Sequence, residues 1–258
     1  MLTAAFVFIV GSIVGSFLNV CIYRLPKEES VIFPRSYCPH CKKGIRWYDN
    51  VPFLSYIFLR GRCRFCHERI SLQYFIVEGM TASSFLFLYR HFGLSGHFFI
   101  YTAWFGALIA ASFIDLKHQI IPDEISLGGL VAGLLASFLY PPLHHVLSPW
   151  LSLWHAVLGA SAGGGSIYLI GLLGNFIFKK ESMGGGDVKL LAMVGSILGW
   201  KMALVAFFVA PFFGSVVGIV LKIRKGAEII PYGPFLSLGS MVALFWGNHI
   251  LAYLGILR

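Results

Sequence analysis

The sequence predicts an all-α polytopic membrane protein with about eight transmembrane helices. Hydrophobic residues make up 57% of the 258 residues and charged residues only 12%. This composition is too apolar for one water-soluble core. Apolar runs close to the roughly 20 residues that cross a bilayer recur along the chain. A single large polar segment interrupts them, between the first run and the second.

The predicted spans follow from these runs in order. Seven are near spanning length: 2–23, 72–89, 98–115, 125–140, 150–178, 202–223 and 235–257. An eighth run, 188–200, is shorter and could be tilted, thinned or partly re-entrant. The first run lacks the basic stretch that precedes a secretory signal, so we expect it to be a retained span. Glycines inside the spans, such as Gly11, Gly15 and Gly163 to Gly165, favour close helix packing.

The chain therefore divides into three parts. Residues 1–24 form the first transmembrane helix, 25–71 form a polar loop, and 72–258 form the remaining membrane core. The loop is rich in charge, proline and aromatic residues. We expect it to be the one module that folds outside the bilayer.

The basic residues orient the chain across the membrane. All but Arg90, Lys201 and Arg258 of the 20 lysines and arginines fall in one set of alternate loops. Because such residues collect in cytoplasmic loops, the polar loop should face the cytosol and both termini should lie outside. Contact with anionic lipid headgroups accounts for the formal charge of +9, and no nucleic-acid partner is required.

Two CxxC pairs stand in the polar loop, Cys38 with Cys41 and Cys63 with Cys66. Four thiolates on two tight turns match the tetrahedral four-sulfur shell of a structural zinc ion, which leaves no position open for water. The ion would hold together a segment too small to build a large core. The alternatives are a pair of redox dithiols, which the reducing cytosol disfavours, and exchange of an adjacent histidine into the shell.

Three acidic residues lie at membrane depth, where ionisable groups are costly and usually functional. They are Glu78, Asp115 and Asp187. Asp115 ends the third predicted span and Asp187 begins the sixth, so topology places both near the cytosolic boundary. Gly184 to Gly186 precede Asp187, and we expect the backbone to turn sharply there and to approach a substrate closely.

Two neighbouring carboxyl groups share a proton, because both cannot ionise cheaply. One can then take a proton from water while the other protonates the peptide, which hydrolyses the bond without a covalent intermediate. The alternative for Asp187 is a helix N-cap. For Asp123, which follows Pro122, a cap is the favoured interpretation. Glu78 could pair within the bundle or contact a substrate charge.

These residues resemble the bacterial type IV prepilin peptidases, a family within the GxGD membrane aspartic proteases. The resemblance covers landmarks from the first span to the last. They are Gly15-Ser16-Phe17-Leu18-Asn19-Val20, Arg24-Leu25-Pro26, the two cysteine pairs, Asp115, Ile121-Pro122-Asp123, Gly184-x-Gly186-Asp187-x-Lys189-Leu190 and Pro231-Tyr232-Gly233-Pro234.

The resemblance implies eight spans in the bacterial inner membrane and cleavage of the basic leader of prepilins and pseudopilins, after a glycine. It implies that Asp115 and Asp187 are catalytic, within an active-site loop that contains Gly184, Gly186 and Lys189. Members with the four-cysteine loop often also methylate the new N-terminal amine with S-adenosylmethionine. No glycine-rich fingerprint for that cofactor is present, so the sequence names no methyltransferase residues.

Two rival functions belong to other classes. Ser161 lies within a GxSxG pattern and could serve an intramembrane serine protease, with His155 or His249 as its base. The chain could instead be a scaffold or transporter that uses the cysteine loop for docking. Transporters tend to show matched halves, whereas this chain has one large loop near its start.

Overall fold

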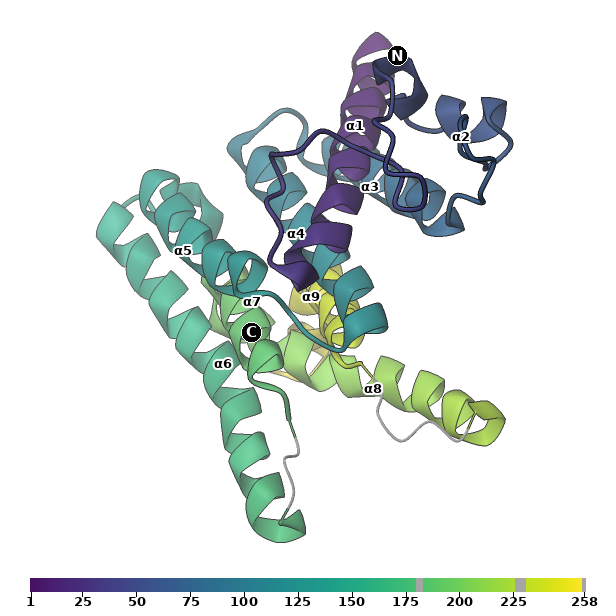
Figure 1. Cartoon of the computed structure of the whole chain (residues 1–258). Coiled ribbons are helices and arrows are strands. Elements are labelled where there is room, and N and C mark those ends of the chain that lie inside the picture. Colours follow the sequence, from purple (N-terminus) through teal and green to yellow (C-terminus); the bar gives the residue numbers. More distant parts are fainter. Residues whose placement is uncertain (180–182, 226–230, 257–258) are drawn as a thin grey trace. The chain divides into compact units, whose positions relative to one another are not determined.

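The computed structural model describes residues 1–179, 183–225 and 231–256, and these residues are predominantly helical (Figure 1). The chain divides into two compact units, Met1–Ala110 and Ala111–Arg258. Helix α4, Gly96–His118, crosses the boundary between them. Isolated β-bridges join Tyr37 to Gly44 and Arg62 to Arg69, both in the polar loop.

In the first unit, α1 (Leu2–Arg24) packs along α3 (Leu72–Phe92). Glycines set the distance between them. A Cβ atom on Gly11 would lie 2.9 Å from the Ala82 backbone, and one on Gly15 would lie 2.7 Å from the Glu78 backbone. The predicted role of these two glycines in close helix packing is therefore confirmed.

The polar loop has little regular structure. It contains η1 (Leu25–Lys27), η2 (Trp47–Asn50) and α2 (Leu54–Phe58). Arg24 is 4% exposed, and its guanidinium group donates hydrogen bonds to the carbonyl oxygens of Ser30 and Pro34, both at 2.8 Å. The end of α1 thereby fixes the start of the loop through backbone acceptors.

In the second unit, the short helix α7 (Gly185–Leu198) is central. It packs against α5 (Asp123–Leu139), α6 (Pro149–Phe178), α8 (Trp200–Lys225) and α9 (Gly233–Tyr253). The connection between α5 and α6 contains η3, Pro141–His144. Along α7, the side chains of Leu190, Leu191, Met193 and Val194 are fully buried. Figure 1 shows α7 beside α5 and α6.

Small residues on the neighbouring helices make room for α7. A Cβ atom on Gly159 would overlap the carbonyl oxygen of Gly195, and one on Gly163 would overlap that of Leu191. The glycine run in α6 thus lets two backbones meet, as predicted from the sequence. Gly165 is the exception, because a Cβ atom there would meet nothing within 4 Å.

Five described helices are long and apolar enough to cross a membrane by length and composition, so the chain is a multi-pass membrane protein. They are Leu2–Lys27, Gly96–His118, Pro149–Ile177, Trp200–Ile219 and Gly233–Tyr253. That α3, α5 and α7 also cross, which gives eight spans, remains a prediction. Two basic residues used in orienting the chain, Lys180 and Arg258, lie outside the described residues.

Candidate active site and metal centre

Asp115 lies near the end of α4 and is 6% exposed. Its Oδ2 atom accepts a hydrogen bond of 2.8 Å from the backbone N–H of Gly233. Gly233 is the first residue of α9, where backbone N–H groups have no partner within the helix. The start of α9 therefore supplies a donor and a favourable dipole to the Asp115 carboxylate.

Asp187 lies in the first turn of α7, after the N-cap residue Gly184. It interacts electrostatically with Asp115, so the fold brings these two carboxyl groups into one site. Asp187 is the third residue of α7 and not its N-cap, and its carboxyl group accepts a hydrogen bond from the backbone of the N-cap residue Gly184. The phenol group of Tyr232 also interacts electrostatically with Asp187.

The glycines before Asp187 do not form the expected sharp turn. Gly185 and Gly186 belong to the first turn of α7, and neither they nor Gly184 has a positive φ. Gly186 instead leaves room for a neighbouring side chain. A Cβ atom on Gly186 would lie 3.1 Å from the Ile121 Cβ atom, whereas one on Gly185 would meet nothing within 4 Å. A side chain at position 186 would therefore require Ile121 or the start of α7 to shift, whereas one at position 185 would not.

Gly233 has a similar role on the other side of the site. A Cβ atom there would lie 2.9 Å from Asp115 Oδ2 and 3.2 Å from Ile121 Cδ1. The hydrogen bond from Gly233 to Asp115 therefore depends on the absence of a side chain. The sequence pattern included Gly233 and Ile121 among its landmarks but indicated no role for either, because their importance arises from contacts between distant helices.

Asp123 is not a helix cap, so the favoured interpretation from the sequence was wrong. Pro122 occupies the N-cap position and no side chain caps the helix. Asp123 instead accepts a hydrogen bond from Lys189, with 2.6 Å between Nζ and Oδ1. Both side chains are partly exposed, so the ion pair adds little stability, but it joins the starts of α5 and α7.

Glu78 lies in the first unit, within α3, and is 6% exposed. Its Oε2 atom accepts a hydrogen bond of 3.0 Å from the backbone N–H of Phe53, and it also bonds the side chain of Ser16. These contacts join the polar loop to α1 and α3. They agree with the interpretation that Glu78 pairs within the bundle.

The four cysteines of the polar loop form a candidate metal site. The Sγ atoms of Cys38, Cys41, Cys63 and Cys66 all lie within 4.8 Å of one another. Hydrogen bonds from the backbone N–H groups of Cys66 and Phe65 lower the pKa of the Cys63 thiol to about 7, whereas burial and hydrogen bonds with the neighbouring thiols raise the pKa of Cys66 to about 12. A thiolate is the form that binds metal, so this donor set fits a tetrahedral thiolate site.

The two cysteine pairs adopt matching turns. The N–H of Lys42 donates to the carbonyl oxygen of Cys38 at 2.9 Å, and the N–H of His67 donates to that of Cys63 at 3.0 Å. Lys42 and His67 each follow the second cysteine of a pair, and both have φ of 58°. The same local backbone geometry thus presents the thiols of each pair.

An ion pair joins the second cysteine turn to η2. Arg64 donates two hydrogen bonds to Asp49, from Nε at 2.7 Å and from Nη2 at 2.6 Å. These bonds to Arg64 lower the pKa of the Asp49 carboxyl group. The bidentate geometry fixes the orientation of both groups and helps to order the middle of the loop.

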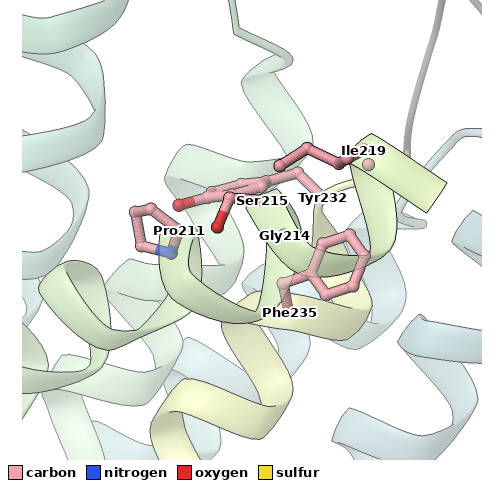
Figure 2. Close-up of a pocket in the computed structure, with 7 residues that line it drawn as sticks. Pro211, Gly214, Ser215, Ile219, Tyr232 and Phe235 are labelled. Carbon is pink, nitrogen blue, oxygen red and sulfur yellow. The ribbon is translucent and has the colours of Figure 1, made fainter. Parts of the chain in front are cut away.

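A pocket of about 400 Å³ lies between α8 and α9. Figure 2 shows its lining residues, with the Tyr232 ring beside Ser215. The lining consists of Pro211, Gly214, Ser215, Gly218, Ile219, Tyr232 and Phe235. Tyr232 immediately precedes Gly233, which binds Asp115. The wall of this largely apolar pocket is therefore continuous with the backbone that holds one of the two carboxylates.

The serine site considered from the sequence is not assembled. Ser161 is exposed on α6. Within the described part of the chain, no hydrogen bond joins it to His155 or His249. The His155 ring instead lies 6.2 Å from that of His144, centroid to centroid. Ser161 therefore has no positioned base, which a serine nucleophile requires.

Comparison with known families agrees with this arrangement. Residues 9–92 match the bacterial peptidase A24 N-terminal domain, and residues 100–219 match the type IV leader peptidase family. The first match covers most of α1, the cysteine loop and α3. The second covers the part of the chain that contains both Asp115 and Asp187.

Individual relatives are similar over most of this chain. A prepilin leader peptidase/N-methyltransferase of Legionella pneumophila is 34% identical, over 92% of this chain and 89% of its own length. A type 4 prepilin-like proteins leader peptide-processing enzyme of Escherichia coli is 36% identical, over 91% of both chains. A Myxococcus xanthus prepilin leader peptidase/N-methyltransferase is 37% identical, over 87% of this chain and 65% of its own length. No solved structure matches the chain.

Proposed function

Because the chain belongs to the type IV leader peptidase family, we propose that it cleaves the basic leader peptide from type IV prepilins and pseudopilins. The observation that carries this proposal is the convergence of Asp115 and Asp187 from separate helices. Their carboxyl groups interact electrostatically, and Ile121 lies beside both Gly186, which precedes Asp187, and Gly233, which binds Asp115. Paired carboxyl groups supply the acid and the base that peptide hydrolysis requires. The enzyme is thus an aspartic endopeptidase.

Both carboxyl groups accept a backbone hydrogen bond, Asp115 from Gly233 and Asp187 from Gly184. Because a charge on Asp115 disfavours a second charge on Asp187, the pair would share one proton. The carboxylate without the proton would act as the base that takes a proton from the attacking water, and the protonated partner would donate its proton to the peptide group.

The proposed location is the bacterial inner membrane, with both termini outside and the cysteine loop and active site facing the cytosol. The distribution of lysine and arginine in alternate loops supports this orientation. The substrates would be membrane-inserted prepilins or pseudopilins, whose basic leaders lie on the same side as the active site.

A second activity is N-methylation of the new N-terminal residue. The names of the Legionella pneumophila and Myxococcus xanthus relatives, which include N-methyltransferase, support it. S-adenosylmethionine would supply the methyl group. The retained cysteine loop also supports this proposal, since the resemblance links that loop to the second activity.

The proposed metal is one structural zinc ion held by Cys38, Cys41, Cys63 and Cys66. The clustered thiols and their matching turns support it. The ion would order the loop by joining its two halves. All four ligands would come from the protein, so no position remains for a reacting water.

Co-expression with a prepilin and mass spectrometry of the pilin N-terminus test both activities. Asp115→Asn and Asp187→Asn should each abolish cleavage, by at least about 10³-fold, because each removes an acid or base. The proteins should accumulate normally and keep their zinc. Ser161→Ala should cleave normally. Active aspartate variants together with an inactive Ser161 variant would favour the serine protease instead.

A further inference from the structure

The connection between α4 and α5 lies beside the starts of α7 and α9. Helix α7 carries Asp187, and the first residue of α9 binds Asp115. Helix α4 ends at His118, and Gln119 then adopts a left-handed conformation with φ of 56°. Ile120 and Ile121 follow, before α5 begins after Pro122. The two isoleucines differ sharply, because Ile120 is 47% exposed whereas Ile121 is 9% exposed.

Ile121 fills the space where a side chain would stand on the glycine next to each carboxylate. Its Cβ and Cγ1 atoms lie 3.1 and 3.4 Å from the position of a Cβ atom on Gly186, which precedes Asp187. Its Cδ1 atom lies 3.2 Å from the equivalent position on Gly233, whose N–H binds Asp115. One side chain thus occupies the space beside both glycines, so that neither position has room for a side chain without a shift of its neighbours.

The backbone on each side of Ile121 is linked to elements of the site. On one side, the Gln119 N–H donates to the Asp115 carbonyl oxygen at 2.9 Å. On the other, the ion pair between Asp123 and Lys189 joins the start of α5 to α7. These links, together with the burial of Ile121, favour its position beside Gly186 and Gly233.

We infer that Ile121 is a positioning residue that sets the separation of the Asp115 and Asp187 carboxylates. It acts as a rigid spacer between the starts of α7 and α9. A branched side chain suits this role because χ1 is restricted. The inference rests on the proposed function, since the spacing matters only if these carboxylates act as a pair.

Three variants test the spacer in a cleavage assay with purified enzyme and prepilin. Ile121→Ala removes every contact beyond Cβ, so kcat should fall about tenfold or more, because small displacements of catalytic groups are costly. Ile121→Val keeps the atoms that reach Gly186 and lacks only Cδ1, so its loss should be smaller. Ile120→Ala is the matched control and should retain normal kcat, since that side chain is exposed.

The pattern of kinetic constants separates positioning from folding. The spacer predicts a graded loss of kcat, from Ile to Val to Ala, with KM within about twofold of normal. Unchanged kcat in Ile121→Ala would overturn the inference. So would a loss that follows a fall in melting temperature and disappears when the assay is cooled, because that would show a purely structural role.

Failure of the inference can be distinguished from failure of the proposed function. If Asp115→Asn and Asp187→Asn are inactive while Ile121→Ala is normal, only the spacer is wrong. If the aspartate variants themselves cleave prepilin, the proposed catalytic pair is wrong and the spacing has no catalytic meaning.

Discussion

At the scale of single residues, two adjacent glycines in α7 have different surroundings. A methyl group on Gly186 would press against Ile121, whereas one on Gly185 would point into open space. Replacing either with alanine changes helix propensity by the same amount, about 1 kcal/mol in favour of the helix. Any difference in activity between the two variants therefore shows the effect of the tight packing between Gly186 and Ile121, next to Asp187.

We expect Gly186→Ala to lower prepilin cleavage about tenfold or more, because Ile121 or the first turn of α7 must shift. Gly185→Ala should cleave at a rate close to that of the unmodified enzyme. The measurement is the initial rate of leader release at matched protein amounts. Equal activity of the two variants would show that the packing of Gly186 does not constrain the site.

His144, in the connection between α5 and α6, predicts a pH-dependent stability. Its Nε2 atom lies 3.0 Å from Ser137 Oγ, and burial lowers the pKa of its imidazole to about 4. The unfolded chain, with a histidine pKa near 6.5, therefore binds a proton more readily. Stability contributed by the neutral ring is complete above about pH 6.5 and is lost as the pH falls towards 4.

The expected loss over this range is on the order of 2 kcal/mol. It should appear as a fall in the melting temperature of the detergent-solubilised protein between pH 7 and about pH 4.5. His144→Gln should reduce that fall, whereas His145→Gln, at an exposed neighbouring position whose charge is the smallest cause of the shift, should reduce it far less. Identical pH profiles for all three proteins would contradict the assignment.

The individual residues show what a sequence can and cannot predict. Asp115, Asp187 and the four cysteines could be selected because their chemistry is unusual at membrane depth or in close pairs. Ile121 and Gly233 could not, because an isoleucine and a glycine are ordinary in an apolar chain. Asp123 was misassigned for a related reason, since its partner Lys189 is distant in sequence.

At the scale of elements, apolar runs predicted the helices but not their ends. The predicted span 98–115 is Gly96–His118, because polar residues extend a helix beyond its apolar part. The run at 188–200 begins earlier, at Gly185, because the glycines join the helix. The central position of α7 depends on glycines in other helices and was not predicted.

The cysteine loop is the element whose order should depend most on metal. We expect purified protein to contain about one zinc ion per chain, and chelation should expose residues 25–71 to protease. Cys38→Ser should lose the ion. Cys21→Ser is the matched control and should keep it, because Cys21 lies in α1 and is not part of the cluster.

Metal content by elemental analysis and limited proteolysis measure these effects together. A loop that stayed protease-resistant after complete loss of zinc would show that hydrogen bonds and ion pairs, such as that between Asp49 and Arg64, suffice to hold it. Retention of zinc by Cys38→Ser would instead imply a different ligand set.

At the scale of the whole molecule, the number of membrane spans depends on whether helix α7 crosses the bilayer. It has 14 residues, so it extends about 21 Å at 1.5 Å per residue, less than the roughly 30 Å of a hydrocarbon core. It can cross only where the bilayer is thinned or where other helices surround it. Its buried side chains meet the second condition, because they contact protein and not lipid.

If α7 crosses, the number of spans is even and both termini lie outside. If it re-enters on the same side, the C-terminus lies in the cytosol. Alkaline phosphatase fused to the C-terminus of the whole chain should therefore be active, and green fluorescent protein at the same position should stay dark. A fusion after Glu29 should give the opposite result, and one after His145 should match the C-terminus. A fluorescent C-terminal fusion, with the two internal fusions as expected, would mean that α7 does not cross the membrane, although Asp187 at its start could still meet Asp115.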